Sequence, residues 1–528
     1  MKSRYKFRVL LFPLFGVLAS CGGDDSASPG GGGGGGNGNG WQAGVFLPSS
    51  TFDALCAAPR AGTSDRRGTA ADENNWLRSW SHELYLWYGE ITDRDPAQYT
   101  TETYFPLLKT SATTTSGQAK DKFHFIYDTD VWQALSQGGT SAGYGAEFAV
   151  LASTAPRRIV VAYTEAGSPA VSQFQRGDEI LQVDGVDAIN GTSQAVVDTL
   201  NAGLFPDAAG EAHSFMVRST AGATRTISIT SANITHIPVP IVTTFNTASG
   251  QVGYIQFNDH IATAETPLKN AIGLLDSANV TDLILDLRYN GGGYLDLASE
   301  LAYMIGNTTL TAGRTFEKIV FNDKNPSRNP VTGENLTPTP FHTTTQGWQG
   351  QGPAGQALPS LSLNSVYIIT GPGTCSASES IINSLRGVNV AVYLIGSTTC
   401  GKPYGFYPTD NCGTTYFTIQ FRGENAANFG DYTDGFSPAN TAGVRGTPVP
   451  GCSVADDFTR ALGDPTESRI AAALNFRASN NQACPAASGN SEPRLSKSSF
   501  GGSEDLRLAV SKPAARLNRI VRSQAGAG

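Results

Sequence analysis

Apolar segments of strand length alternate with segments of helical pattern between residues 233 and 476, and this alternation constrains the fold more than any other feature. Segments 252–257 and 281–287 are apolar, and 263–278 between them carries apolar residues at helical spacing. The pattern then predicts a helix at 294–305, a strand at 365–370, a helix at 377–386 and a strand at 390–395. Strands separated by helices are typical of βαβ units, so we expect a core with a mostly parallel sheet.

The rest of the chain predicts a multidomain α/β protein, because 528 residues are too many for one hydrophobic core. Residues 41–137 predict a helical N-terminal domain, since tryptophan, tyrosine and leucine side chains recur there at helical spacing. Residues 306–360 interrupt the core with polar, Pro/Gly-rich sequence, which indicates an excursion over the surface. Periodicity is lost after Cys484, so we expect 477–528 to be a disordered tail.

The first 40 residues indicate export. Basic residues precede an apolar stretch that is too short to span a bilayer, and the sequence Leu-Ala-Ser-Cys then ends at Cys21. This resembles the bacterial lipobox, in which a signal peptidase cuts before the cysteine and that cysteine is acylated. The resemblance implies a signal peptide over 1–21, a lipid on Cys21 and a Gly-rich tether over 22–40. No aspartate follows the cysteine, which favours the outer membrane, facing the periplasm or the cell surface; secretion without a lipid is the alternative.

The chain has seven cysteines, and lipidation of Cys21 leaves six. An even number in an exported protein predicts disulfides, although six cysteines allow about fifteen pairings. We expect Cys400 to pair with Cys412 across a hairpin, and Cys452 to pair with Cys484 across a helical segment. No Cys/His spacing typical of zinc is present, so no metal site is expected.

Residues 138–232 contain short β-type runs. They include the stretch Gly-Asp-Glu-Ile-Leu-Gln-Val-Asp-Gly, which ends at Gly185. This segment resembles a PDZ domain. The resemblance implies that the backbone N–H groups of a loop bind the terminal carboxylate of a peptide, which adds a strand to the sheet edge. The matching loop consists of Gly143, Tyr144, Gly145 and Ala146. A structural β-domain without a peptide ligand is the alternative.

Three motifs follow predicted strands of the core. Residues 286–293 read Asp-Leu-Arg-Tyr-Asn-Gly-Gly-Gly, residues 373–379 read Gly-Thr-Cys-Ser-Ala-Ser-Glu, and residues 399–405 read Thr-Cys-Gly-Lys-Pro-Tyr-Gly. Taken singly, these are a tight turn, a helix N-cap and a surface lysine. Because the carboxyl ends of parallel strands meet at one edge of a sheet, we expect the three to lie together.

In this order, the motifs resemble the carboxyl-terminal processing proteases, also called tail-specific proteases. The resemblance implies a ClpP/crotonase-like protease core and a serine endopeptidase that needs no cofactor. Ser376 would be the nucleophile and Lys402 the general base, a role that requires a buried, neutral amine. The N–H of Ala377 and that of Gly292 or Gly291 would form the oxyanion hole.

One position departs from the family. A glutamine that orients the lysine usually lies four residues after it, and here Phe406 occupies that position. Tyr404, Thr409 and Gln420 are candidate substitutes, and a dyad without a third member is the alternative.

Other chemistries fit the sequence less well. The stretch 396–402 matches most of a phosphate-binding loop, but Pro403 replaces the Ser or Thr that binds magnesium. The stretch 139–143 matches a nucleophile elbow without the strand before it and the helix after it. A triad with His260 as base stays open. The formal net charge of −8 and the lack of a basic cluster among aromatic residues argue against nucleic acid as a partner.

The sequence therefore predicts a lipid-anchored serine endopeptidase that cleaves proteins with accessible, often apolar carboxyl ends, recognised by the PDZ-like segment. The first alternative is a catalytically silent lipoprotein that binds peptide or protein carboxyl ends, and the second is a structural envelope lipoprotein. The oligomeric state is not predicted.

Overall fold

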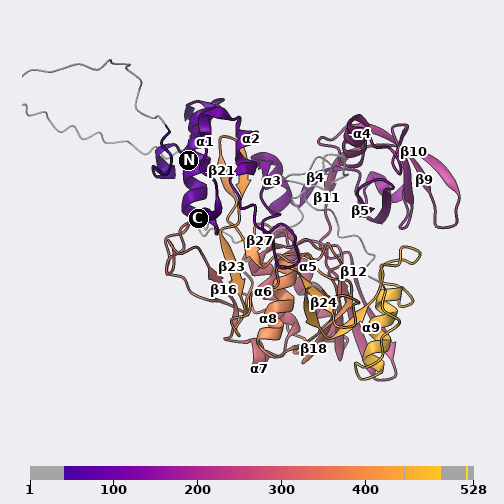
Figure 1. Ribbon diagram of the computed structural model, residues 1–528. Coiled ribbons are helices and arrows are strands. Elements are labelled where there is room, and N and C mark those ends of the chain that lie inside the picture. Colours follow the sequence, from indigo (N-terminus) through magenta and orange to yellow (C-terminus); the bar gives the residue numbers. More distant parts are fainter. Residues whose placement is uncertain (1–40, 445, 489–518, 521–528) are drawn as a thin grey trace, which may run out of the picture. The chain divides into compact units, whose positions relative to one another are not determined.

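The computed structural model describes residues 41–444, 446–488 and 519–520 (Figure 1). Contacts divide the chain into two units, Met1–Gln42 and Ala43–Gly528. The predicted export signal, Cys21, the tether and most of the predicted tail lie outside the described residues. None of the described helices is long and apolar enough to cross a bilayer.

A six-stranded sheet forms the centre of the second unit. Its order is β12 (Ile241–Thr247), β13 (Gly250–Gln256), β14 (Asp282–Asp286), β18 (Ser365–Thr370), β19 (Ala391–Gly396) and β26 (Gly451–Ser453). Only the β12–β13 pair is antiparallel. The predicted strands and the mostly parallel sheet are therefore confirmed.

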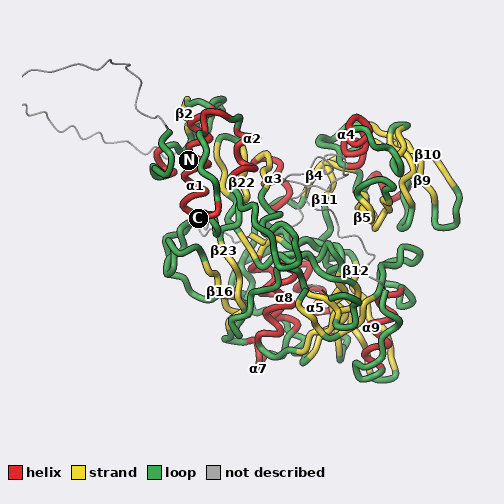
Figure 2. Tube along the Cα trace, viewed as in Figure 1, coloured by secondary structure: helices red, strands yellow, loops and turns green. Residues whose placement is uncertain are grey.

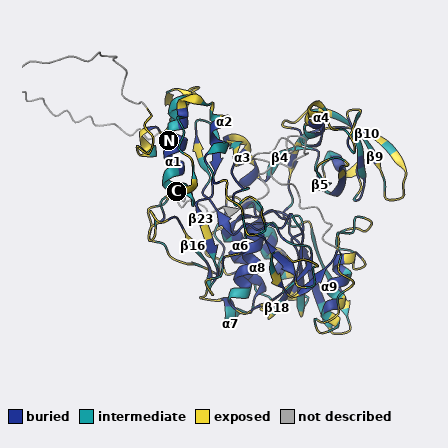
Figure 3. Cartoon of the chain, viewed as in Figure 1, coloured by how far each residue is buried: buried dark blue, intermediate teal, exposed yellow. Residues whose placement is uncertain are grey.

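Helices cover both faces of this sheet. Successive strand residues point to opposite faces, so Leu285 of β14 packs in one hydrophobic cluster and Ile284 in another. The first cluster includes α5 (Glu265–Ser277), α6 (Leu295–Ile305) and α8 (Ala377–Gly387), and the second includes α9 (Ser468–Ala478). Figure 3 shows α6 and α8 largely in the buried colour. The predicted core helices are thus confirmed.

The interruption between 306 and 360 does not stay on the surface. It contains α7 (Thr308–Thr311), and its strand β16 (Thr315–Val320) lies in a second sheet of order β17 (Thr339–Pro340), β16, β23 (Phe421–Glu424) and β20 (Tyr404–Gly405). Phe316, Phe341 and Trp348 are buried in the main core. The predicted surface excursion is wrong here, because these apolar side chains are isolated among polar residues and form no periodic pattern.

The N-terminal region contains α1 (Ala70–Leu84), α2 (Thr101–Tyr104) and α3 (Thr129–Ser136). Its aromatic stripe is core, since the rings of Trp76 and Tyr416 lie 5.4 Å apart. The region is not an independent helical domain, however. Its strand β3 (Phe125–Asp128) pairs with β22 (Thr414–Phe417), which pairs with β21 (Thr409–Asn411). Strand β22, which lies more than 250 residues later in the sequence, therefore pairs with the N-terminal region.

Segment 138–232 forms a sheet of order β10 (Thr224–Thr230), β9 (Ala212–Arg218), β7 (Glu179–Val183), β6 (Arg158–Thr164) and β5 (Ala146–Ala152). Figure 2 labels β10, β9 and β5 among its yellow tubes. β8 (Val186–Asp187) pairs with β7. β5 lies at the edge of this sheet, and α4 (Gln194–Leu204) packs in the same hydrophobic cluster. β4 (Thr140–Gly143) pairs with β11 (Ala232–Thr235), so the entry and the exit of the segment lie side by side.

The remaining strands are short. They are β1 (Leu55–Cys56), β2 (Arg66–Arg67), β15 (Gly293–Tyr294), β24 (Phe436–Pro438), β25 (Thr447–Val449) and β27 (Arg519–Ile520).

Three disulfides join described residues. Cys452–Cys484 is one of the two predicted pairs, and α9 lies between its cysteines. The predicted Cys400–Cys412 pair is wrong: Cys412 pairs with Cys56, and Cys400 pairs with Cys375. Proximity in the sequence favoured the wrong partner, because β3 and β22 bring the N-terminal region to Cys412.

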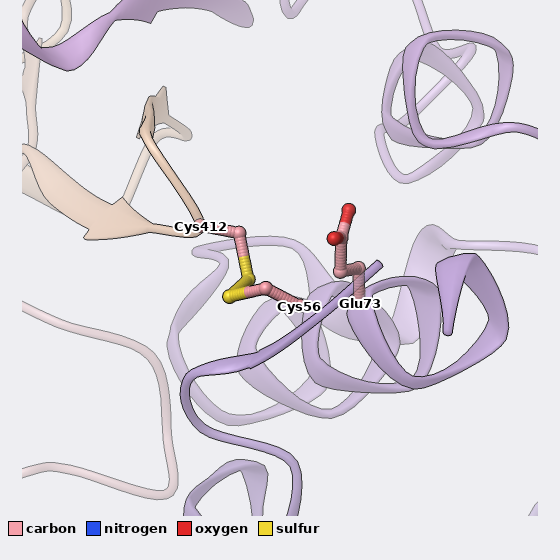
Figure 4. A group of neighbouring side chains, drawn as sticks. All are labelled: Cys56, Glu73 and Cys412. Carbon is pink, nitrogen blue, oxygen red and sulfur yellow. A yellow bond between two sulfur atoms is a disulfide. The ribbon is translucent and has the colours of Figure 1, made fainter. Parts of the chain in front are cut away.

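Glu73 of α1 lies beside the Cys56–Cys412 disulfide (Figure 4). Two cysteines and a glutamate at this spacing resemble a metal-ligand set. A disulfide offers no thiolate, however, and the Glu73 carboxylate accepts a hydrogen bond from the N–H of Ala57. The same reasoning applies to Cys375, Cys400 and Glu379, which form the second such group among the described residues.

Candidate active site

Three loops meet at one edge of the central sheet. They follow β14, β18 and β19, which are neighbours in the sheet and run parallel. The three motifs of the sequence therefore lie at adjacent carboxyl ends, as the βαβ pattern predicts.

Ser376 lies in the sharp turn between β18 and α8. It is fully buried, and its φ of 60° falls in the left-handed region that non-glycine residues rarely adopt. Ala377 is the first residue of α8, where backbone N–H groups have no acceptor within the helix. The turn thus presents the serine at a helix N-terminus, whose dipole favours a developing negative charge.

Glu379 ties this turn to the loop after β19. Its Oε2 accepts hydrogen bonds from the N–H of Ser376 at 2.9 Å and from the N–H of Lys402 at 2.8 Å. Its Oε1 accepts from the N–H of Gly401 at 2.9 Å and from the Thr399 hydroxyl. Burial raises the pKa of Glu379, and these hydrogen bonds oppose that shift. A single carboxyl group therefore holds the backbone of the predicted nucleophile and that of the predicted base together.

Taken singly, the motif 373–379 predicts a helix N-cap. Glu379 has that role in part, because the bond from the Ser376 N–H is one half of a capping box. The bonds to the loop of Lys402 could not be predicted, since they join segments more than 20 residues apart.

A disulfide connects the same two loops. Cys375 precedes Ser376, Cys400 lies two residues before Lys402, and the two cysteines are bonded. The N–H of Cys400 also donates to the carbonyl of Thr374 at 3.0 Å. The spacing between the two loops is therefore fixed by a covalent bond as well as by Glu379.

Lys402 is fully buried between aromatic rings. Its Nζ lies 4.4 Å from the ring centre of Phe406 and 4.8 Å from that of Phe123. Burial disfavours a charged amine, whereas ring faces favour one. Phe406, at the position of the family's glutamine, thus contacts the amine directly.

The candidate substitutes for that glutamine have other contacts. Gln420 accepts a hydrogen bond from the N–H of Tyr407 at 3.0 Å, and the Thr409 hydroxyl donates to the Tyr407 carbonyl. The ring of Tyr404 packs edge-on against Trp87. Phe123, which no sequence signal pointed to, is the second aromatic neighbour of the amine.

The glycine turn after β14 is held by Asn290. The Asn290 carbonyl accepts from the N–H of Cys375 and from the Ser378 hydroxyl, both at 3.1 Å, which places the turn against the start of α8. The Asn290 side-chain oxygen accepts from the N–H of Gly292 at 2.9 Å. The predicted oxyanion donor Gly292 is therefore engaged, and Gly291 is the adjacent glycine of the turn.

His260, the alternative base, lies behind this turn. Its Nδ1 is 2.9 Å from the Asn290 side-chain oxygen, and because that oxygen only accepts, Nδ1 carries the proton. Burial lowers the pKa of His260 to about 3, so the ring is neutral at neutral pH. The N–H of His260 donates to the Gly292 carbonyl. These bonds make His260 a support of the glycine turn.

Arg288, within the loop after β14, is held by ion pairs with three carboxylates. It is fully buried and pairs with Asp286, Asp456 and Glu467 at 2.7–2.9 Å. Burial alone would lower the pKa of Arg288, but the three carboxylates raise it well above its ordinary value. The guanidinium is therefore a fixed cation that compensates three acidic groups.

Segment 138–232 reaches the same network through Arg176. Its guanidinium donates to Asp456 at 2.8 Å and to the Tyr289 hydroxyl at 2.7 Å. The Tyr289 hydroxyl itself donates to Asp456 at 2.5 Å. Neither Arg176 nor Asp456 lies in a recognisable motif, so the sequence analysis had no signal for this link.

The predicted peptide-binding loop leads into the edge strand β5. Tyr144 is buried, and its hydroxyl donates to the Gly203 carbonyl of α4 at 2.8 Å. Gly145 has a φ of 78°, and a side chain there would collide with Ser168. Ala146 begins β5, and Gly143 ends β4.

The competing motifs do not acquire the structure they need. The stretch 396–402 leads into β20 and not into a helix, and 140–143 is itself a strand. Neither loop therefore has the geometry of a phosphate-binding loop or a nucleophile elbow.

Comparison with known proteins identifies this core. Residues 251–406 match the family model of peptidase family S41. This stretch is similar to the core of that peptidase family. The match covers β13 to Phe406 and so includes all three loops.

Two curated relatives are similar to part of this chain. The chain is 26% identical over 245 residues to a carboxyl-terminal-processing protease of Picosynechococcus, covering 45% of this chain and 49% of that protein. It is 28% identical over 229 residues to a chloroplastic C-terminal processing peptidase of Tetradesmus obliquus, covering 40% and 46%. The chain thus spans about half the length of the curated relatives it matches.

A solved structure shares the fold over a longer stretch. A crystal structure assigned to the S41 proteases, from Bacteroides fragilis, matches with a TM-score of 0.56 and 20% identity. The match covers 77% of this chain and 98% of that one, so the shared fold extends beyond residues 251–406.

Proposed function

We propose that the protein is a serine endopeptidase of the C-terminal processing type, with Ser376 as nucleophile and Lys402 as general base. The observation that carries the proposal is the double hydrogen bond to Oε2 of Glu379, which holds the backbone N–H groups of both residues at one atom. The Cys375–Cys400 disulfide supports it, because it fixes the same two loops.

The chemistry is acyl transfer. Neutral Lys402 takes the proton of the Ser376 hydroxyl, and the oxygen attacks the scissile carbonyl. The N–H groups of Ala377 and Gly291 stabilise the tetrahedral oxyanion, since the N–H of Gly292 is held by Asn290. Lys402 then protonates the leaving amine and later activates the water that hydrolyses the acyl-enzyme.

Full burial favours the neutral form of the Lys402 amine, and the rings of Phe406 and Phe123 lie against its Nζ. The alternative base, His260, is committed to the Asn290 side chain.

Substrate recognition is assigned to segment 138–232 as a PDZ-like domain. Its edge strand β5 offers the place where a peptide adds a strand, and the loop of Gly143, Tyr144, Gly145 and Ala146 lies at the start of that edge. The substrates are proteins with accessible carboxyl ends. The lipid on Cys21 would hold the enzyme at a membrane of the cell envelope.

The decisive experiment measures cleavage of an unstructured protein with an apolar carboxyl end. The parent is compared with Ser376→Ala and Lys402→Ala, and with Ser277→Ala and Lys269→Ala on the exposed part of α5 as matched controls. We expect cleavage by the parent and both controls, with losses of about 10³-fold or more in the two site variants. Activity that survives Lys402→Ala contradicts the dyad.

The silent binding protein predicts another outcome. No form would then cleave, while a peptide with a free carboxyl end would bind and its amidated form would not. This result would replace the endopeptidase by a binding lipoprotein.

A further inference from the structure

A short strand from the far end of the chain lies at the candidate active site. Arg519–Ile520 forms β27, which pairs in parallel with Gly293–Tyr294 of β15, in the register Gly293 with Arg519 and Tyr294 with Ile520. These two residues are the described part of the chain beyond residue 488.

β15 is the direct continuation of the glycine turn. Gly293 follows Gly291 and Gly292, and its φ of 138° lets the backbone pass within contact distance of His260. His260 also forms a parallel bridge with Gly293, and its carbonyl accepts from the N–H of Tyr294 at 2.8 Å. Because a strand has two edges, His260 occupies one edge of β15 and β27 occupies the other.

The loop of the predicted base borders the same segment. Cα atoms of β27 and β20 approach to within 8 Å, and β20 begins at Tyr404, two residues after Lys402. The segment at 519–520 therefore lies beside the turn proposed to bind the oxyanion and beside the loop that carries the proposed base. Under the proposed function, a peptide whose carbonyl lies at Ser376 and at the oxyanion hole lies beside the same turn.

We infer that Gly293–Tyr294 is the strand edge on which substrate peptides align at the scissile bond, and that the chain's own residues Arg519–Ile520 occupy this edge as a competitor in cis. The inference rests on the proposed function, because it assigns the occupant of the same site. Strand addition uses backbone groups, so the edge accepts peptides of different sequence.

A two-residue ladder is weak, but tethering makes it effective. A segment of the same chain acts at a local concentration on the order of millimolar, so even weak pairing occupies the edge for much of the time. A substrate that adds to the edge displaces the segment. The free enzyme is thereby partly shielded, and removal of the segment raises the apparent affinity for substrate.

The test uses the full chain with Ser376→Ala, so that nothing is cut. The probe is a fluorescein-labelled, carboxyl-amidated peptide with the sequence of residues 512–528; the amide excludes binding through a carboxylate. One variant carries Arg519→Pro and Ile520→Pro, which remove the backbone donors of the strand. The matched control carries Arg519→Ala and Ile520→Ala, which keep those donors.

We expect the proline pair to bind the probe about tenfold more tightly than the parent or the alanine pair, because the competitor in cis is lost. A probe carrying the same two prolines should not bind. Equal affinity of the parent and the proline pair would overturn the inference.

The kinetic counterpart uses Ser376-containing chains. We expect the proline pair to lower KM for an amidated peptide about tenfold and to leave kcat unchanged. The binding measurement needs no turnover. Its result therefore tests the competitor even if the cleavage assay shows no activity. Cleavage without any change in probe affinity would overturn the competitor and leave the endopeptidase in place.

Discussion

Glu379 has two structural roles, one within α8 and one between two loops. It closes the first turn of α8, and it collects N–H groups from the loops of Ser376 and Lys402. A carboxylate only accepts hydrogen bonds, so every group directed at it is a donor.

Glu379→Gln should therefore disturb the geometry of the site while keeping its volume. The new amide donor would face the N–H groups of Ser376 and Lys402, and we expect kcat to fall about 100-fold with KM little changed. Steady-state kinetics test this, with Glu102→Gln at the exposed start of α2 as control. A variant that changes KM alone would remove Glu379 from the positioning of the two loops.

A second buried carboxyl group, that of Glu300, should make the free energy of unfolding depend on pH. Glu300 on α6 and Glu265 on α5 are both buried and both accept from the N–H of Gln346. Burial and the hydrogen bond and charge of Glu265 raise the pKa of Glu300 to about 10. Folded Glu300 is thus protonated at neutral pH, whereas the unfolded chain ionises it above its ordinary pKa of about 4.3.

The free energy of unfolding should therefore decrease as pH rises from about 4.5 to 10, by up to about 1.4 kcal/mol per pH unit from this group. Glu300→Gln keeps a neutral donor and removes the ionisation. Urea denaturation should show the variant more stable by about 2–4 kcal/mol at pH 8 and equal to the parent near pH 4. Parallel pH curves for the two proteins would contradict the assignment.

At the scale of elements, the Cys375–Cys400 disulfide joins the turn before α8 to the loop after β19. Its role is positional, because both cysteines flank proposed catalytic residues. The Cys452–Cys484 disulfide lies outside the loops of the site, around α9, and is a natural comparison.

Replacing Cys375 and Cys400 together by alanine should lower kcat about tenfold and reduce stability by about 3 kcal/mol. Replacing Cys452 and Cys484 together should reduce stability by a similar amount and leave kcat unchanged. Kinetics and thermal melting of the two double variants provide the test. Equal effects on kcat would mean that the first disulfide acts on stability alone.

Elements with continuous apolar sequence were predicted well. β18 occupies the predicted residues 365–370, and α8 extends one residue beyond the predicted 377–386, because these segments are buried and uninterrupted. The burial of Phe316 and Phe341 in the main hydrophobic core was not predicted, since isolated aromatic residues form no periodic pattern. The proposed site residues were predicted through their motifs, whereas Phe123 and Arg176 contact the three loops only through tertiary structure.

At the scale of the whole molecule, Arg176 links segment 138–232 to the glycine turn after β14 through Asp456 and Tyr289. Asp456 also pairs with Arg288, so one carboxylate serves both arginines. Burial would raise the pKa of Asp456, but these arginines and Arg469 hold it well below its ordinary range.

Arg176→Met should break this link and keep most of the side-chain volume. We expect kcat for short amidated peptides to stay unchanged, while the advantage of long substrates with a free carboxyl end falls about tenfold. This advantage is measured as the ratio of kcat/KM for the two substrate types. The control is Arg218→Met, which removes an exposed ion pair with Glu179. An unchanged ratio would show that Arg176 is purely structural.

The Cys56–Cys412 bond has a consequence for how damage to this molecule would be seen. It closes a covalent ring over 356 residues of sequence, which contains segment 138–232 and Ser376. A single backbone cut anywhere inside that ring leaves both fragments joined. An enzyme nicked in this way would keep its full mass until a reductant is added, so an intact band on a non-reducing gel is no proof of an intact chain.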